Sequence, residues 1–413
     1  MKKLLRLKPT TIVLALLCAM YFLTYIDRVN VSSAAAGFGS EFQLSKTQIG
    51  FVFSAFAYPY LIFQIIGGWV SDRFGAKKTL IYSGLLWALA TVLTGFAGGL
   101  ISLVAARVLL GFGEGATFPA ATSAMARWIP KENRGFAQGI THAFARIGNA
   151  VAPALIIFIL VAYGWRWSFY VSGILSLIWV IVWAYFFTEN PADHPLITPE
   201  ELAKKPAPRV TQKTPWKRLA KRMAPVTIVY FCYGWTLWLF LSWIPQYFLH
   251  SYDLKIKTSA LFASSVFLAG VLGDTLGGVV SDSILRKTND LNKARSWMVA
   301  ICMTLTLVSL LPIMFSHDIT VSVISLSLGF FFAEMTIGPM WAIPMDIAPE
   351  FSGTASGMMN TGSALAAIIS PVASGFLIDY YGSWELPFVG SIILMAAGVL
   401  LSLRMKPSQR FTA

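Results

Sequence analysis

Long apolar stretches recur along the whole chain, and they limit its possible folds more than any other feature. A membrane-spanning helix needs roughly 20 apolar residues, and about twelve such stretches can be placed, near 11–36, 48–70, 78–97, 100–127, 136–161, 167–188, 226–250, 258–280, 297–316, 319–347, 354–377 and 385–404. Charged residues make up 12% of the 413 residues, whereas a soluble domain has about a quarter. The sequence therefore predicts an all-α membrane protein with about twelve transmembrane helices.

The first ten residues are basic and precede an apolar run, as in a signal peptide. That run is too long for a signal peptide and has no small-residue cleavage site, so we interpret it as a retained first helix. The three cysteines, Cys18, Cys232 and Cys302, fall inside expected spans. Their positions suggest small apolar packing residues and indicate no disulfide or metal framework.

The net charge of +13 is distributed unevenly between the two sides of the membrane. If the N-terminus is cytoplasmic, 25 of the 32 Lys and Arg residues fall on that side, four fall outside and three lie within spans. This is the bias expected of a membrane protein rather than of a nucleic-acid-binding protein. We expect a multi-pass protein of the cell membrane, the inner membrane in bacteria, with both termini cytoplasmic.

A basic, proline-rich linker at 189–224 divides the chain into 1–188 and 225–405, with a tail at 406–413. The two parts resemble each other in order. GGWVSD at 67–72 matches GGVVSD at 277–282, and ENRGFAQG at 132–139 matches EFSGTASG at 350–357. Such matches at nearly constant offset predict two six-helix bundles, because parallel repeats build one class of secondary transporters with a site between the halves.

The segment GGWVSDRFGAKK resembles the G-x-x-x-D-R-x-G-R-[RK] signature of the major facilitator superfamily (MFS). Gly68, Asp72, Arg73 and Gly75 match it, whereas Ala76 stands where the family usually has a basic residue. The resemblance implies the MFS fold and assigns these four residues to a cytoplasmic latch that stabilises the outward-open state. Gly68 would allow close helix approach, and Asp72 could pair with a basic group or accept from a neighbouring helix N-terminus.

Further motifs resemble the anion:cation symporter branch of that superfamily. They are Y-x-D-R at 25–28, SAFAYPY at 54–60, R-x6-E-G-x-x-F-P at 107–119, GWRWSFYVSG at 164–173, and the pattern of Trp341, Asp346, Asn360 and Gly362. The branch takes up sugar acids, hexuronates and aromatic acids with protons, and also contains vesicular glutamate carriers. Tyr233 stands where those carriers have a substrate-binding Arg, which disfavours glutamate.

Ionisable residues inside the expected spans are the strongest candidates for a site, because each costs at least about 2.5–3.5 kcal/mol to insert. Arg107 and Glu114 are seven residues apart and project from one helix face. They could form a structural salt bridge. The resemblance instead makes Asp27 and Glu114 the proton-coupling acids. Arg28 would anchor a carboxylate through its planar guanidinium, and Arg107 would hold Glu114, the substrate, or each in turn.

Other buried polar or aromatic residues could complete the site. His142 and Arg146 share one helix face. Arg146 is either a second anion contact or a partner of Glu334, and His142 is more often a hydrogen-bonded core residue than a proton relay. Helix packing is the alternative for the aromatic candidates. The proposed substrate contacts are Tyr25, Arg28, Tyr60, Arg107, Arg146, Trp341 and Asn360, with His142 and Glu334 as auxiliary polar residues.

These observations favour proton-coupled symport of a small organic anion by alternating access. A sugar acid, a hexuronate, or an aromatic or dicarboxylic acid would fit. The alternatives are proton-coupled efflux of an amphipathic compound and a non-transporting sensor. An enzyme fits least, since no catalytic or metal-ligand constellation is evident. We expect no cofactor and no nucleic-acid partner. The expected partners are the organic anion, protons and the lipid bilayer around a monomer.

Overall fold

The computed structural model describes residues 8–44, 46–206, 213–252 and 256–412, and all regular structure in these ranges is helical. The chain forms two compact units that do not follow a single cut in the sequence. The first comprises Met1–Pro130, Phe144–Thr214 and Pro349–Gly357, and the second comprises Lys131–Ala143, Pro215–Ala348 and Met358–Ala413.

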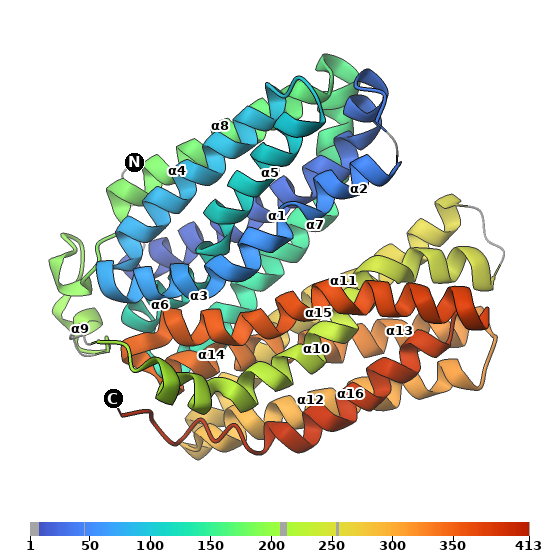
Figure 1. Ribbon diagram of the computed structural model, residues 1–413. Helices are drawn as coiled ribbons and strands as arrows, with labels where there is room; N and C mark the ends of the chain where they lie inside the picture. Colours follow the sequence, from blue (N-terminus) through green and yellow to red (C-terminus); the bar gives the residue numbers. More distant parts are fainter. Residues whose placement is uncertain (1–7, 45, 207–212, 253–255, 413) are drawn as a thin grey trace. The chain divides into compact units, whose positions relative to one another are not determined.

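The helices of the first unit come mainly from the first half of the chain (Figure 1). They are α1 (Pro9–Glu41), α2 (Lys46–Ser54), α3 (Ala57–Phe74), α4 (Ala76–Gly95), α5 (Leu100–Gly115), α6 (Thr117–Trp128), most of α7 (Arg134–Tyr163), α8 (Trp165–Phe186) and the short α9 (Pro199–Leu202). A 3-10 turn at Pro191–Asp193 follows α8, whereas the 3-10 turn Lys131–Asn133 belongs to the second unit.

The second unit contains the beginning of α7 and most of the later helices. These are α10 (Trp216–Ser251), α11 (Ile256–Thr288), α12 (Met298–Leu310), α13 (Ile319–Glu334), α14 (Ile337–Ile347), α15 (Ser352–Tyr381) and α16 (Leu386–Ser402). A π-helical turn, Asn292–Trp297, precedes α12, and a 3-10 turn occupies Leu311–Met314. The 3-10 turn Pro349–Phe351 and the start of α15, up to Gly357, belong to the first unit.

Nine stretches of the described chain are long and apolar enough to cross a membrane. They are Pro9–Ala35, Gln48–Phe74, Leu100–Trp128, Trp165–Phe186, Trp216–Ile244, Leu261–Thr288, Asn292–Met314, Ile319–Ile347 and Pro349–Tyr381. The three other spans expected from the sequence also fall on helices, namely α4, α7 and α16. The all-α membrane fold is therefore confirmed.

The repeat in the sequence is also a repeat in helix packing. In the first unit α4 and α1 both pack on α8, and α3 packs on α5. In the second unit α12 and α10 both pack on α16, and α11 packs on α13. These pairs lie side by side within each unit in Figure 1. Equivalent segments of the two repeats therefore fill equivalent positions.

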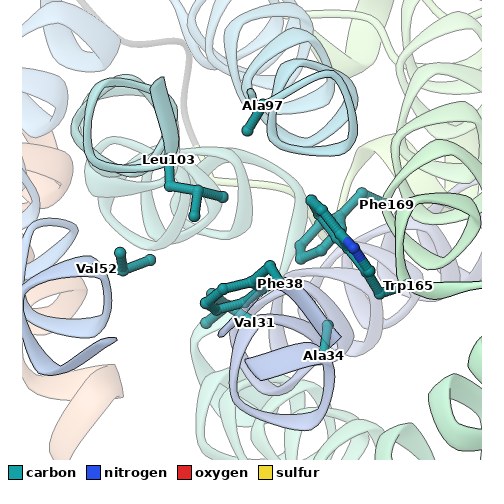
Figure 2. Packing of buried hydrophobic residues seen from close by; sticks show 8 residues of the cluster. All are labelled: Val31, Ala34, Phe38, Val52, Ala97, Leu103, Trp165 and Phe169. Carbon is teal, nitrogen blue, oxygen red and sulfur yellow. The ribbon is translucent and has the colours of Figure 1, made fainter. Parts of the chain in front are cut away.

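A buried apolar cluster holds one end of the first unit together (Figure 2). The end of α1 packs against the start of α8, where the rings of Phe38 and Trp165 meet edge to face at 5.7 Å. Trp165 also donates its Nε1–H to Glu41 at 2.8 Å. Full burial of a large apolar side chain stabilises a fold by roughly 1.5–3 kcal/mol. This end of the unit therefore resists separation of α1 from α8.

Two apolar spans are interrupted at a carboxylate. Glu114 lies in the last turn of α5 before the break to α6, and Glu334 is the last residue of α13 before the break to α14. A proline follows five residues after each, at Pro119 and Pro339. Irregular backbone at membrane depth is tolerated where protein surrounds it, and both carboxylates are fully buried.

Candidate functional site

The centre of the site in the first unit is an ion pair between α1 and α5. Arg28 donates its Nε–H to Oε2 of Glu114 at 2.8 Å. The Glu114 side chain is completely buried, whereas that of Arg28 keeps 18% of its surface exposed. Within the described residues, Oε1 of Glu114 and Nη2 of Arg28 have no hydrogen-bond partner. One donor and one acceptor of the pair therefore remain uncommitted.

Four aromatic rings surround the Arg28 guanidinium. Its carbon lies 4.7–5.3 Å from the ring centroids of Tyr25, Phe56, Tyr60 and Phe118. Each ring face attracts a cation, most strongly where water is excluded. The aromatic cage therefore holds Arg28 in place without neutralising it. Tyr25 and Tyr60 thus lie beside Arg28, and their role as substrate contacts stays a prediction. Tyr58 is different, because it is 64% exposed.

Arg107, on α5, lies beside Phe56, which is one of the four rings around Arg28. Its guanidinium carbon is 5.0 Å from the centroid of Phe56, and the residue is only 4% exposed. It makes no ion pair within the parts of the chain that the structure describes, and its Nε has no hydrogen-bond partner there. Glu114 is therefore paired with Arg28 rather than with Arg107.

Asp27 has partners quite separate from those of its neighbour Arg28. Its Oδ2 accepts from the indole N–H of Trp87, and from the hydroxyls of Thr91 and Ser176 at 3.4 Å each. Its other oxygen, Oδ1, has no hydrogen-bond partner among the described residues. Asp27 is thus directed toward α4 and α8, while Arg28 is directed toward α5.

Arg146 is also buried in the first unit. Its guanidinium carbon lies 5.9 Å from the ring centroid of Tyr25, which places it beside the aromatic cage. His142, one turn earlier on α7, belongs to the second unit. Its Nδ1 lies 2.9 Å from the carbonyl oxygen of Gln138. The pairing of Arg146 with Glu334 would join the two units and stays a prediction.

The second unit holds a chain of polar and aromatic contacts that resembles the first site in outline. Tyr233 donates its hydroxyl to Glu334 at 2.9 Å and stacks on Tyr230, with centroids 5.3 Å apart. Tyr230 accepts from the indole N–H of Trp341 at 2.7 Å. The ring of Trp341 lies 5.1 Å from that of His142. Asn360 is buried on α15 in the same unit.

The latch motif contacts the beginning of α15. Oδ1 of Asp72 accepts from the backbone N–H of Gly353 at 2.9 Å, and Oδ2 accepts from both the N–H and the hydroxyl of Thr354 at 2.6 Å. A side chain on Gly68 would collide with the Gly353 carbonyl. Arg73 lies over the rings of Trp69 and Phe74 instead. A carboxylate at a helix N-terminus is stabilised by the free N–H groups and the helix dipole.

Gly75 provides the turn between α3 and α4. Its φ of +96° is in the region that favours glycine, and a side chain there would meet the carboxylate of Glu189. Glu189 accepts from the backbone N–H groups of Ala76 and Lys77 at 3.1 and 2.8 Å and pairs with Arg127. Sequence reasoning did not identify Glu189, because it lies more than a hundred residues from the helix that it caps.

The second unit has a similar arrangement of an aspartate at a helix N-terminus, which was not recognised from the sequence. Asp282 accepts from the backbone N–H groups of Gly135 and Phe136, at the start of α7, at 3.0 and 2.6 Å. Arg295 is fully buried between Asp282 and Asp346, at 2.9 and 3.1 Å. The match of GGVVSD to GGWVSD was a sufficient signal for Asp282, since the repeat places it where Asp72 stands in the first half.

The site therefore combines buried acids, buried guanidiniums and aromatic rings at interrupted helices in a membrane-spanning, all-helical protein. Within the described residues, no group of three or more His, Cys, Asp and Glu residues could hold a metal ion. Charged groups at this depth mark ion and substrate pathways. Fold and site together define a polytopic membrane transporter rather than an enzyme.

Comparison with known proteins identifies the family. The model of the Major Facilitator Superfamily matches residues 17–371 and 292–412, and the chain belongs to this superfamily. It is 47% identical to the "Probable sulfoacetate transporter SauU" of Cupriavidus necator, over 97% of this chain and 95% of that protein. It is 30% identical to the "Probable galactarate/D-glucarate transporter GarP" of Escherichia coli K12, over 93% and 92%.

A solved structure supports the same fold. The MFS transporter FucP in its outward conformation gives a TM-score of 0.76 at 16% identity, over 96% of this chain and 99% of FucP. The sugar-acid and sulfoacetate relatives fit the anion:cation symporter branch that the motifs indicated. The resemblance stated from the sequence is thereby confirmed.

Proposed function

We propose that this protein takes up a small organic anion together with protons, by alternating access. Sugar acids, hexuronates, aromatic or dicarboxylic acids and short sulfonated acids are the substrate classes to consider, given the names of the relatives. The observation that carries the proposal is the pair of Arg28 with the fully buried Glu114. A buried pair of this kind can exchange one partner for another only if the charge of one member changes.

Protonation of Glu114 would release Arg28 for the substrate. As a carboxylate, Glu114 occupies the Nε–H of Arg28. Once neutral, it competes poorly with an anionic substrate, because it has lost the Coulombic attraction to the guanidinium that the anion keeps. The guanidinium, still held by its aromatic cage, can then bind an incoming carboxylate in bidentate geometry. Proton binding and anion binding therefore favour each other.

Asp27 is the second proton-binding acid in this proposal. Among the residues that the structure describes, its hydrogen bonds come from Trp87, Thr91 and Ser176, and none of these is a basic residue. When the protons leave on the inner side, Glu114 regains Arg28 and displaces the anion. Both acids lie in the first unit. The exchange can therefore use the same residues on the same helices throughout.

The remaining substrate contacts and the orientation are part of the same proposal. Tyr25, Tyr60, Arg107 and Arg146 would line the site in the first unit, with Trp341 and Asn360 from the second. The distribution of Lys and Arg supports cytoplasmic termini in the cell membrane. It also places the Asp72 latch on the cytoplasmic side, where opening of the latch would accompany the change of access. The proposal also includes two bundles that end at 188 and begin at 225, on either side of the basic linker, and a monomeric state.

A first experiment identifies the ligand by thermal stabilisation of the purified protein. A compound that binds only the folded state raises the melting temperature by mass action. The panel holds sugar acids, hexuronates, aromatic acids, dicarboxylates and sulfonated acids, with neutral sugars and amines as controls, at acidic and neutral pH. A response to acids that disappears in Arg28→Ala supports the proposal. A response confined to cationic or bulky amphipathic compounds overturns it in favour of efflux.

A second experiment separates proton coupling from binding. In proteoliposomes loaded with the acid found above, Glu114→Gln should abolish accumulation driven by a proton gradient. Exchange of labelled for unlabelled substrate should continue, because it requires no net proton movement. Accumulation at the wild-type level in Glu114→Gln would remove Glu114 from the coupling mechanism.

A further inference from the structure

Two cationic side chains share one aromatic ring in the first unit. The guanidinium carbons of Arg28 and Arg107 lie 5.3 and 5.0 Å from the centroid of Phe56. Because both distances are measured to the same centroid, the two guanidinium carbons cannot be farther apart than the sum of these distances. Phe56 lies at the break between α2 and α3, next to the start of α3. The ring thus fixes two positive charges close together in a buried place.

The charges around Phe56 do not balance when the acids are neutral. The titratable or charged groups around this place are Arg28 on α1, Arg107 and Glu114 on α5, and the tyrosines of the cage, while Asp27, the neighbour of Arg28, is directed toward α4 and α8. Arg146 approaches through Tyr25. Glu114 neutralises Arg28 only while ionised, and Arg107 has no ion-pair partner within the described residues. With Glu114 and Asp27 both protonated, Arg28 and Arg107 are two adjacent buried cations.

We propose that the substrate is a short dianion whose two acidic groups bind Arg28 and Arg107 beside Phe56, and that it enters with two protons. This inference rests on the proposed function and makes it more specific. An unpaired buried charge is strongly destabilising, so a single carboxylate would leave one guanidinium uncompensated. Nη2 of Arg28 and Nε of Arg107 have no hydrogen-bond partner among the described residues, and each can bind one oxyanion.

The stoichiometry gives a second consequence. One proton on Asp27 and one on Glu114 carry two positive charges inward with the two negative charges of the substrate. No net charge then crosses the membrane. Uptake of the dianion is therefore driven by a pH difference and is indifferent to the membrane potential, whereas a monoanion entering with two protons would move one positive charge inward.

The test compares diacids with their own monoesters in proteoliposomes of the full-length protein. The probes are short dicarboxylates, sulfocarboxylates and phosphonocarboxylates, each beside the ester that masks one acidic group. The diacid should bind at least about tenfold more tightly than its monoester, since one charged hydrogen-bonded contact is worth about 1.5–3 kcal/mol. A potassium diffusion potential of either sign, imposed at constant pH difference, should leave its uptake rate unchanged.

Arg107→Gln provides the matched variant. It should remove the preference for diacid over monoester, because it weakens binding of the diacid more than binding of the monoester. If this variant does not fold, the wild-type comparison still decides the question. Equal binding of diacids and monoesters, or diacid uptake that follows the membrane potential, overturns the inference and leaves organic-anion transport standing. Failure of every organic acid to bind overturns the proposed function itself.

Discussion

Arg28 is positioned by one ion pair and by four aromatic rings, and this arrangement predicts the result of a conservative change. Arg28→Lys keeps the charge but removes the planar fork and the Nε–H that bonds Glu114. Lysine can also make only point contacts with an oxyanion. We expect the substrate affinity to fall by about tenfold to a hundredfold, which corresponds to loss of one charged hydrogen bond. Calorimetric titration with the acid identified by the panel measures this change.

Arg218→Lys is the matched control for that substitution. Arg218 is exposed and donates to the carbonyl of Thr412 near the C-terminus, away from the aromatic cage. Its replacement should leave the affinity unchanged. If Arg28→Lys binds the substrate as tightly as the wild type does, Arg28 is not the anion anchor.

The partners of the buried charges show what spacing in a sequence can and cannot predict. Arg107 and Glu114 are on one helix face, as expected, yet the ion pair forms across helices with Arg28. Spacing relates residues of one helix, whereas contacts between helices depend on packing. For the same reason neither the role of Phe56 nor the donors to Asp27 could be read from the sequence. The acids and guanidiniums themselves could be, because charge inside an apolar span is conspicuous.

At the level of helices, each repeat places an aspartate against the N-terminus of a helix. Asp72 receives two backbone N–H groups of α15 and the Thr354 hydroxyl. Asp282 receives two from α7 and also pairs with the fully buried Arg295. Replacement by Asn removes the negative charge and puts an amide NH2 group, which is a donor, against backbone N–H groups that are also donors. We expect Asp72→Asn to lower the free energy of unfolding by roughly 1–3 kcal/mol. Asp282→Asn should lower it further, since Arg295 loses one of two counter-charges.

Thermal unfolding of both variants in one detergent tests this order. Ser316→Ala is a suitable control because its hydroxyl only accepts from a nearby loop N–H. A smaller loss for Asp282→Asn than for Asp72→Asn would contradict the account.

The helices themselves were predictable in all twelve segments, because a run of apolar residues is read directly. Two of these segments are interrupted at a glutamate, and the pattern Glu-x4-Pro occurs there in both halves. This shared pattern is visible only when position 114 is aligned with position 334.

Across the whole chain, the two repeats share the same helix arrangement but differ in the residue that bonds the buried glutamate. In the first half Arg28 bonds Glu114, and in the second half Tyr233 bonds Glu334. Tyr25 and Arg28 have the same spacing as Tyr230 and Tyr233. A neutral donor has thus replaced the cation at the equivalent place. The proton-dependent exchange proposed above uses residues of the first half, whereas the hydrogen bond from Tyr233 to Glu334 in the second half has a neutral donor.

The segment that follows the first half is docked on the first unit. Glu201 accepts from the backbone N–H of Thr10 at 3.1 Å and from its hydroxyl, while Lys205 donates to the carbonyl of Trp128 at 3.0 Å. Burial raises the pKa of Glu201, but the hydrogen bonds from Thr10 and the charge of Lys205 outweigh this and lower it below its usual 4.5. Burial also lowers the pKa of Lys205 despite Glu201. The attachment therefore depends mainly on the bonds that Glu201 accepts.

A carboxyl group whose pKa is lower in the folded state stabilises the fold above its unfolded pKa, and this contribution is lost as the pH falls through the folded value. Glu201→Gln should accordingly lower the melting temperature at pH 7, by an amount equivalent to about 0.5–1.5 kcal/mol. The difference between variant and wild type should shrink below pH 4.5, where protonation weakens the same bonds in the wild type. Glu200→Gln, on the exposed neighbour, should show no such trend. A difference that is constant across the pH range would show that Glu201 does not tie this segment to the first helix through its charge.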